Sequence, residues 1–117
     1  MAAPHSAEMH QVMARELIHH GDEAAAVANF REAIRLDPKL PGLHFQFGIL
    51  LYNSTDQKLQ SEAEEQFQAA LAVNPHDEKS QLMLGEVAAR RGDLKAAYDA
   101  DAHAVAMQPN EIGRAHV

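Results

Sequence analysis

The sequence predicts an all-α fold made of three helix-turn-helix repeats, with six helices in all. Its 117 residues are 46% apolar and only 5% aromatic, tryptophan is absent and alanine is abundant. Alanine favours helices over strands, so a core of small side chains is expected to be helical. Pro38, Pro75 and Pro109 are spaced by 37 and then 34 residues, and such regular spacing is typical of repeat proteins. A chain of this length is expected to form one domain.

Each repeat is expected to begin with a helix that has one apolar stripe. An i, i+1, i+4 pattern occurs three times, and residues at this spacing lie along one side of an α-helix. The stripe residues are Met13, Ala14 and Leu17, then Phe47, Gly48 and Leu51, and finally Leu84, Gly85 and Ala88.

A tight turn and a second helix are expected to follow. Gly21 and Gly92 favour the left-handed conformation that ends a first helix, and Asp22 and Asp93 are placed to cap the next helix. Proline cannot continue a helix, so the three prolines mark where the second helices stop. Residues at fixed distances before these prolines are Ala26, Phe30 and Ala33, then Ala63, Phe67 and Ala70, and finally Ala97, Asp101 and Ala104.

The middle repeat has no glycine at the turn and is three residues longer. Its second helix begins either after Asp56 as the cap, with an extra turn, or after Ser61, which forms a capping box with Glu64. We favour Asp56, because residues 57–73 contain no helix-breaking residue.

This pattern of small residue, Gly-Asp, alanine, aromatic residue, alanine and proline resembles the tetratricopeptide repeat family. The family's tryptophan position is occupied by His10, His44 and Gln81. The resemblance implies an α-α superhelix whose first helices line a concave groove. The expected segments are a disordered tail at 1–6, repeats at 7–40, 41–77 and 78–111, and a tail at 112–117.

The resemblance also implies which side chains face the groove. Phe45, Ile49, Tyr52 and Leu82 are expected to form an apolar centre that anchors a partner peptide, with Arg15, Lys79 and Arg90 orienting it. In the alternative interpretation, these apolar residues pack the first helices against one another. The full predicted peptide-groove set is Gln11, Arg15, His19, Phe45, Ile49, Tyr52, Asn53, Lys79, Leu82, Glu86 and Arg90.

Some family members clamp the C-terminal carboxylate of heat-shock chaperones with five lysine, asparagine and arginine side chains. Of the five equivalent positions in this chain, only Lys79 has the residue type of the clamp; the others are Gln11, Arg15, Gln46 and Met83. The resemblance therefore does not extend to a chaperone-tail clamp, and the protein or peptide partner is not identified by the sequence.

Composition and charge argue against several other classes of function. The net charge of −7 argues against non-specific nucleic-acid binding. No apolar run is long enough to cross a bilayer and the first residues lack a signal-peptide pattern, which favours a cytoplasmic location. The chain has no cysteine, and the adjacent His19 and His20 point about 100° apart on a helix. Neither metal, cofactor nor enzymatic activity is expected; His10 and His44 are expected to be half-buried and hydrogen-bonded.

Asp101 stands where the other repeats have phenylalanine. Two interpretations remain open. Asp99, Asp101 and His103 make the last helix polar enough to cap the repeats, or the chain is part of a longer array. In the second case Ala100, Ala104 and Met107 would form an exposed seam open to self-association. The alternative function is therefore a structural scaffold or oligomerisation segment that associates through its C-terminal edge.

Overall fold

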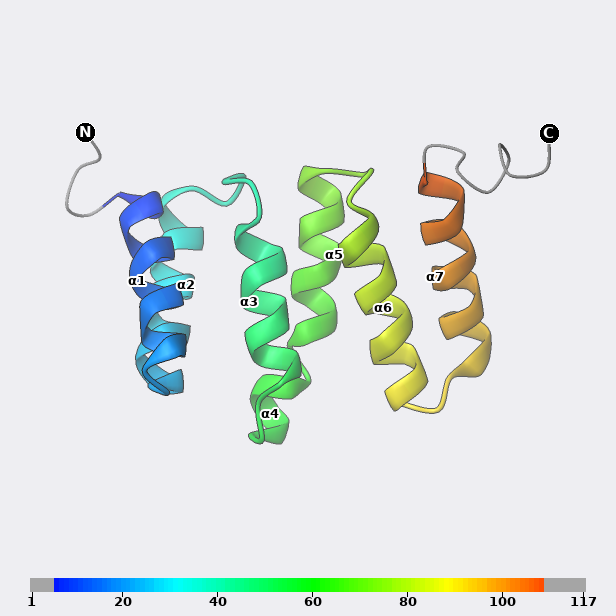
Figure 1. Cartoon of the computed structure of the whole chain (residues 1–117), viewed down its shortest axis with the longest axis horizontal. Coiled ribbons are helices and arrows are strands. Elements are labelled where there is room, and N and C mark those ends of the chain that lie inside the picture. Colours follow the sequence, from blue (N-terminus) through cyan, green and yellow to red (C-terminus); the bar gives the residue numbers. More distant parts are fainter. Residues whose placement is uncertain (1–5, 109–117) are drawn as a thin grey trace. The chain divides into compact units, whose positions relative to one another are not determined.

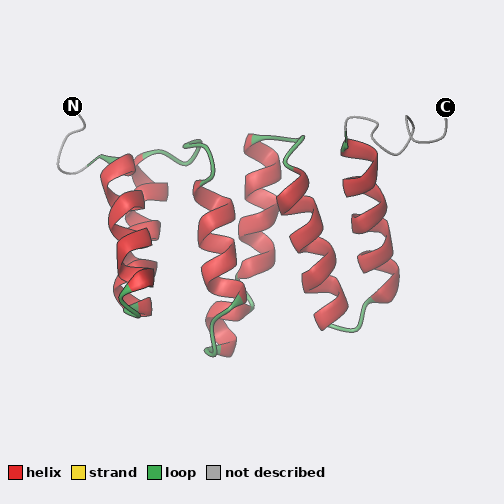
Figure 2. Ribbon diagram, in the orientation of Figure 1, coloured by secondary structure: helices red, strands yellow, loops and turns green. Residues whose placement is uncertain are grey.

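The computed structural model describes residues 6–108, which fold into helices joined by short turns, with no strand in this range (Figures 1 and 2). Within residues 6–108, six helices have ten or more residues, as the sequence predicts, and a seventh has four residues. The predicted tails lie outside the described residues, except that Ser6 caps the first helix. The helices are α1 (Ala7–His19), α2 (Glu23–Leu36), α3 (Leu43–Tyr52), α4 (Gln57–Gln60), α5 (Ala63–Val73), α6 (Glu78–Arg90) and α7 (Leu94–Met107).

The Gly-Asp turns have the predicted conformation. Gly21 has a φ of +78°, and its N–H donates to the carbonyl of Ile18 while the N–H of Asp22 donates to that of Leu17. This pair of bonds defines a Schellman motif, which needs a left-handed residue after the helix. The same two bonds recur around Gly92, whose φ is +86°. These glycines therefore fix where α1 and α6 end.

Aspartates cap the helices that follow the turns. The side chain of Asp22 accepts from the N–H of Ala25, and that of Asp93 accepts from the N–H of Ala96. Asp77 caps α6 in the same way. Each carboxylate satisfies an amide that has no partner inside its helix, which sets the first residue of that helix.

The longer middle repeat contains a break that the sequence analysis did not predict. Asp56 does cap a helix, because its Oδ1 accepts from Lys58 N at 2.9 Å. The prediction of one continuous helix from this cap is wrong, since α4 ends after one turn and α5 begins at Ala63. The hydroxyl of Ser61 donates to the carbonyl of Lys58, and Glu62 N bonds to Leu59 O in a tighter turn. Such local hydrogen bonds compete with the helical ladder.

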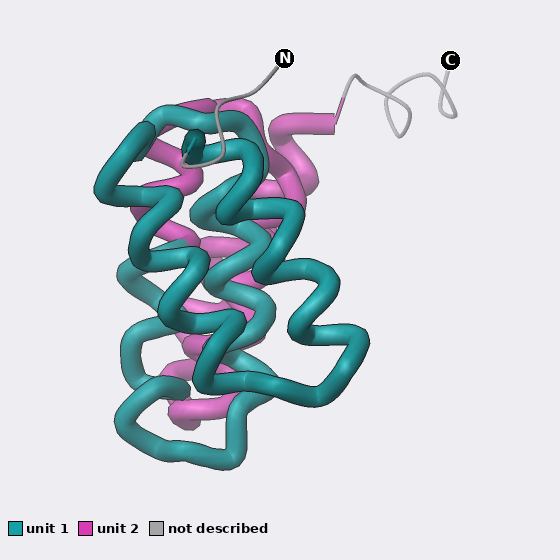
Figure 3. The backbone as a smooth tube through the Cα atoms, turned by 90° about the vertical axis from the view of Figure 1, so that its left-hand side faces the viewer, with its two compact units in different colours: residues 1–66 teal, residues 67–117 magenta. Residues whose placement is uncertain are grey.

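The chain divides into two compact units, residues 1–66 and 67–117, with the boundary inside α5 (Figure 3). In the first unit, α2 packs against both α1 and α3. Phe30 of α2 and Phe47 of α3 are fully buried and stack with ring centroids 5.3 Å apart. The guanidinium of Arg31 lies over the Phe47 ring and pairs with Glu62 at 2.9 Å. The contact between α2, the second helix of the first repeat, and α3, the first helix of the next repeat, therefore has an aromatic centre.

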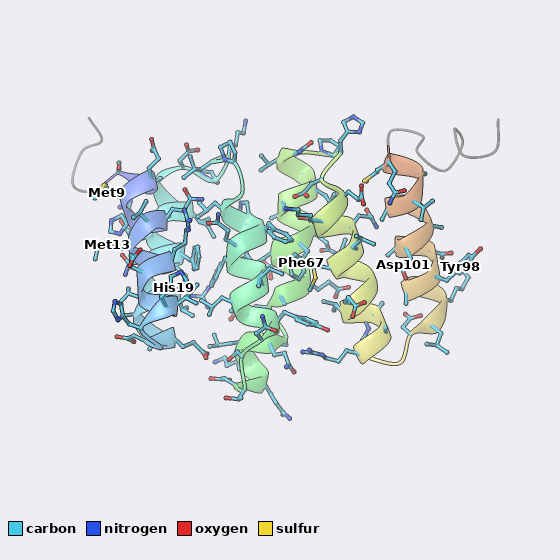
Figure 4. The ribbon with its side chains drawn as sticks, in the orientation of Figure 1. Met9, Met13, His19, Phe67, Tyr98 and Asp101 are labelled. Atoms are coloured by element: carbon cyan, nitrogen blue, oxygen red, sulfur yellow. The ribbon has the colours of Figure 1, made fainter. Side chains whose placement is uncertain are left out.

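In the second unit, α6 packs against α7 through small residues. Ala88, Ala97 and Ala104 are buried, and Gly85 is buried beside Asp101. A Cβ on Gly85 would collide with the Asp101 carboxylate and would lie 3.4 Å from Ala97 O. Asp101 is exposed overall, but its carboxylate is turned toward α6 (Figure 4). The absence of a side chain at Gly85 is what gives the carboxylate this space.

Candidate peptide-binding surface

Helix α3 has one buried face and one partly exposed face. Phe47 and Leu51 are fully buried, whereas Phe45, Ile49 and Tyr52 have intermediate exposure. The second set recurs every three or four residues and therefore lies along one face of the helix. These three side chains stand at positions that the buried core of the unit does not require. They are partly open to solvent, as an anchoring surface needs to be.

The helix α1 contributes polar side chains from the same unit. Gln11 Nε2 donates to Gln46 Oε1 at 3.0 Å, which joins α1 to α3. Arg15 and His19 are exposed, and Ile18 between them is 39% exposed. We call the predicted residues of α1 and α3, together with the residue that ends α3, the α1/α3 surface. Its members are Gln11, Arg15, His19, Phe45, Ile49, Tyr52 and Asn53.

The remaining predicted residues lie in the second unit, on α6. Lys79, Leu82, Glu86 and Arg90 follow one another at intervals of three or four residues, so they share one face of the helix. All four are exposed, and Leu82 retains 40% of its accessible surface. This α6 face has an apolar side chain among charged ones. Its composition is therefore similar to that of the α1/α3 surface.

A shallow depression on the first unit is lined by two arginines, but their charges are compensated. Arg31 pairs with Glu62, and Arg35 pairs with Glu32 in the same helix. The hydrogen bond from Arg35 to Glu32, together with the negative charge of that carboxylate, raises the pKa of Arg35. The depression therefore offers an anionic ligand little uncompensated positive charge, and we do not assign a binding role to it.

Two histidines take the hydrogen-bonded positions predicted for them. His10 is half-buried, with its Nδ1 2.9 Å from Asn29 Oδ1. His44 is 8% exposed, and its Nε2 donates to the carbonyl of Pro38 at 2.8 Å, since a carbonyl can only accept. Its Nδ1 lies 2.8 Å from the Gln66 amide. Within residues 6–108, no group of three histidine or acidic side chains is placed to hold a metal ion.

Two exposed apolar stripes were missed by the sequence analysis. On α1, Met9, Val12 and Met13 are 37%, 47% and 49% exposed, although Met13 was predicted to belong to a packed stripe. Met13 is exposed because, among the described residues of the first unit, no helix lies on that side of α1 (Figure 4).

The second missed stripe is on α7 and replaces the predicted seam. Ala100 and Ala104 are buried and Met107 is half-buried, so the exposed seam that the longer-array interpretation placed at these three residues is wrong. They face α6, the other helix of the second unit. The large apolar residues exposed on α7 are instead Leu94, Tyr98 and Val105. Tyr98 points away from α6 (Figure 4).

The fold and these surfaces define a helical-repeat protein. Two profiles of the tetratricopeptide repeat family match the chain, one over residues 7–40 and the other over residues 61–112. The chain belongs to the tetratricopeptide repeat family. A comparison with curated proteins found no match. Among the described residues, no helix is long and apolar enough to cross a membrane.

Proposed function

We propose that the chain is a non-enzymatic protein-interaction module whose α1/α3 surface binds an extended or helical segment of a partner. Tetratricopeptide repeats generally mediate protein–protein interaction and are typically non-catalytic. The observation that supports this surface most directly is the partial exposure of Phe45, Ile49 and Tyr52 on one face of α3. Aromatic and aliphatic side chains that are half-buried before binding lose little conformational freedom when a ligand covers them.

The polar residues around this apolar centre would orient the ligand. Arg15 and His19 are exposed on α1, and Gln11 already forms a hydrogen bond with α3. Polar and charged groups at the edge of an interface exclude water from its centre and set the direction of the bound segment. Arg15 would favour a partner that has an acidic residue near its apolar anchor.

The α6 face is proposed as a binding face of the second unit in its own right. Leu82 supplies an apolar contact, and Lys79 and Arg90 supply positive charges at the two ends of the helix. We propose the boundaries 7–40, 41–77 and 78–111 for the three repeats, each of which contributes candidate binding residues from its first helix.

Peptides selected from a random display library on the immobilised full chain would supply a ligand for the test. The dissociation constant of a selected peptide is measured by fluorescence anisotropy for the wild type, Tyr52→Ala and Ile49→Ala. Loss of an anchoring aromatic side chain costs about 2 kcal/mol, so Tyr52→Ala is expected to weaken binding roughly 30-fold. Glu65→Ala, an exposed change on α5 outside the predicted set, is the control.

Unchanged affinity in Tyr52→Ala and Ile49→Ala, with circular dichroism spectra like that of the wild type, would show that the ligand binds elsewhere. Failure of repeated selections to enrich any peptide that binds the wild type would also count against the proposal. Self-association through the C-terminal edge, the alternative function, would use α7 and would leave these measurements unaffected.

A further inference from the structure

The exposed stripe of α1 has a buried counterpart in the same unit. Met9 and Met13 stand 34 residues before Leu43 and Phe47 of α3, and the two pairs occupy the same positions in successive repeats. Leu43 and Phe47 are fully buried, whereas Met9 and Met13 are more than one third exposed. The difference arises because α3 packs on α2, while within its unit α1 has a second helix on one side only.

The exposed stripe of α7 has its counterpart in α2. Tyr98 and Val105 stand 71 residues after Val27 and Ile34, at the same positions of their repeats. Val27 is 9% exposed and Ile34 is half-buried, but Tyr98 and Val105 are 73% and 48% exposed. The face of α2 next to Phe30, the ring that stacks on Phe47 of α3, therefore has an equivalent on α7 that no described helix of the second unit covers.

We propose that the chain associates head to tail with a second copy of itself, with α1 of one copy packing on α7 of the next as α3 packs on α2. The argument for this occupant is that the chain already contains the contact once, between α2 and α3 of the first unit. The two exposed stripes are the two halves of that contact. Both halves have exposed apolar side chains, and both are present in every copy. This inference goes beyond the proposed peptide binding and uses different residues.

The two stripes differ from each other, so the contact is heterologous. A dimer therefore retains one uncovered α1 stripe and one uncovered α7 stripe, to which further copies can bind. Growth of short linear oligomers with rising concentration is the expected behaviour. A chain that closed on itself through the same stripes would stay monomeric at every concentration.

Asp101 limits the strength of this contact. It occupies the position of Phe30, the ring that stacks on Phe47 in the first unit. A carboxylate near an apolar interface costs desolvation energy and fills less space than a phenyl ring. The Asp101 carboxylate is turned toward Gly85 of its own unit, away from the stripe that Tyr98 and Val105 form. Association is therefore expected to be weak, with dissociation constants of about 10 μM to 1 mM.

Two substitutions, one in each stripe, test the contact in the full chain. Association is measured by sedimentation velocity at protein concentrations of about 10 μM to 1 mM. Met13→Asp places a charge in the α1 stripe, and Tyr98→Asp places one in the α7 stripe. Both residues are exposed, so folding should be retained, and each variant alone is expected to be monomeric. Asp101→Phe restores the ring at the centre of the contact and is expected to tighten association by about tenfold or more.

A mixture of Met13→Asp and Tyr98→Asp is the sharpest arm of the experiment. The first variant retains an intact α7 stripe and the second an intact α1 stripe. Their equimolar mixture is therefore expected to form a one-to-one dimer that does not grow further. Val73→Asp, a change at an exposed apolar residue of α5, is the matched control and is expected to associate like the wild type.

Three results would overturn the inference. A wild type that remains monomeric up to millimolar concentration would show that the stripes do not bind a second copy. Dimers of Met13→Asp alone would indicate pairing of α7 with α7, and dimers of Tyr98→Asp alone would indicate pairing of α1 with α1. Peptide binding through the α1/α3 surface can succeed or fail independently of each of these results.

Discussion

The stacked rings of Phe30 and Phe47 allow the contact between α2 and α3 to be measured as an energy. Both side chains are fully buried, and their centroids lie 5.3 Å apart with an interplanar angle of 24°. A double-mutant cycle replaces each phenylalanine by leucine, singly and together. Leucine keeps an apolar side chain at the site but removes the ring, so the coupling between the two substitutions reports the stacking.

The expected losses in the free energy of unfolding follow from the surroundings of Phe30 and Phe47. Phe30→Leu is expected to lower the free energy of unfolding by about 1.5 kcal/mol, because a smaller apolar side chain replaces a buried ring. Phe47→Leu should cost about 0.5 kcal/mol more, since the Arg31 guanidinium also lies 5.3 Å from the Phe47 centroid. Offset aromatic pairs contribute roughly 1 kcal/mol beyond their burial. The double variant should therefore lose about 1 kcal/mol less than the sum of the single losses.

Urea unfolding followed by far-ultraviolet circular dichroism gives these free energies. Ser6 caps α1, because its hydroxyl oxygen accepts a hydrogen bond from Met9 N. Ser6→Ala removes this cap. This substitution shares no side-chain partner with Phe30, so its combination with Phe30→Leu serves as the additive control. Strict additivity of Phe30→Leu and Phe47→Leu, within about 0.3 kcal/mol, would refute the conclusion that the rings stabilise one another.

Substitutions at three further residues test local features of the fold by thermal or urea unfolding. Gly21→Ala should cost about 1–2 kcal/mol from left-handed strain alone, because nothing lies within 4 Å of the added Cβ; a loss near zero would show that the turn can relax. Asp22→Ala should cost about 1 kcal/mol and Asp22→Asn much less, since asparagine also caps helices; equal losses would contradict the capping role. His44→Leu should cost about 1–3 kcal/mol because the Pro38 carbonyl loses its donor, and an unchanged midpoint would indicate that water replaces the imidazole.

The repeat frame was predictable from the sequence because it depends on local chemistry. Gly21 and Gly92 are needed for a left-handed turn, and Asp22 and Asp93 cap the following helix. These contacts join residues close in sequence and do not depend on how the helices pack. The break at Ser61 was not predictable in the same way. Residues 57–73 have no proline or glycine, and the turn there depends on competing hydrogen bonds within the segment and accompanies the ion pair of Glu62 with Arg31 of α2.

The candidate surfaces were predictable only in part. The partial exposure of Phe45, Ile49 and Tyr52 agrees with positions that the family resemblance indicated, whereas their role in binding stays a prediction. The exposed stripes were missed because an apolar pattern does not say whether a neighbouring helix is present. Met13 and Phe47 occupy the same position, and only the packing distinguishes the exposed residue from the buried one.

Mapping of a selected peptide onto the chain by nuclear magnetic resonance tests the central claim most directly. Backbone amide shifts of the isotopically labelled full chain would be followed as the peptide is added. The account predicts that the largest shifts lie on the α1/α3 surface, around Arg15, Ile49 and Tyr52, with little change at Arg35 on α2. Shifts concentrated on α2, or along the α7 stripe of Tyr98 and Val105, would contradict it.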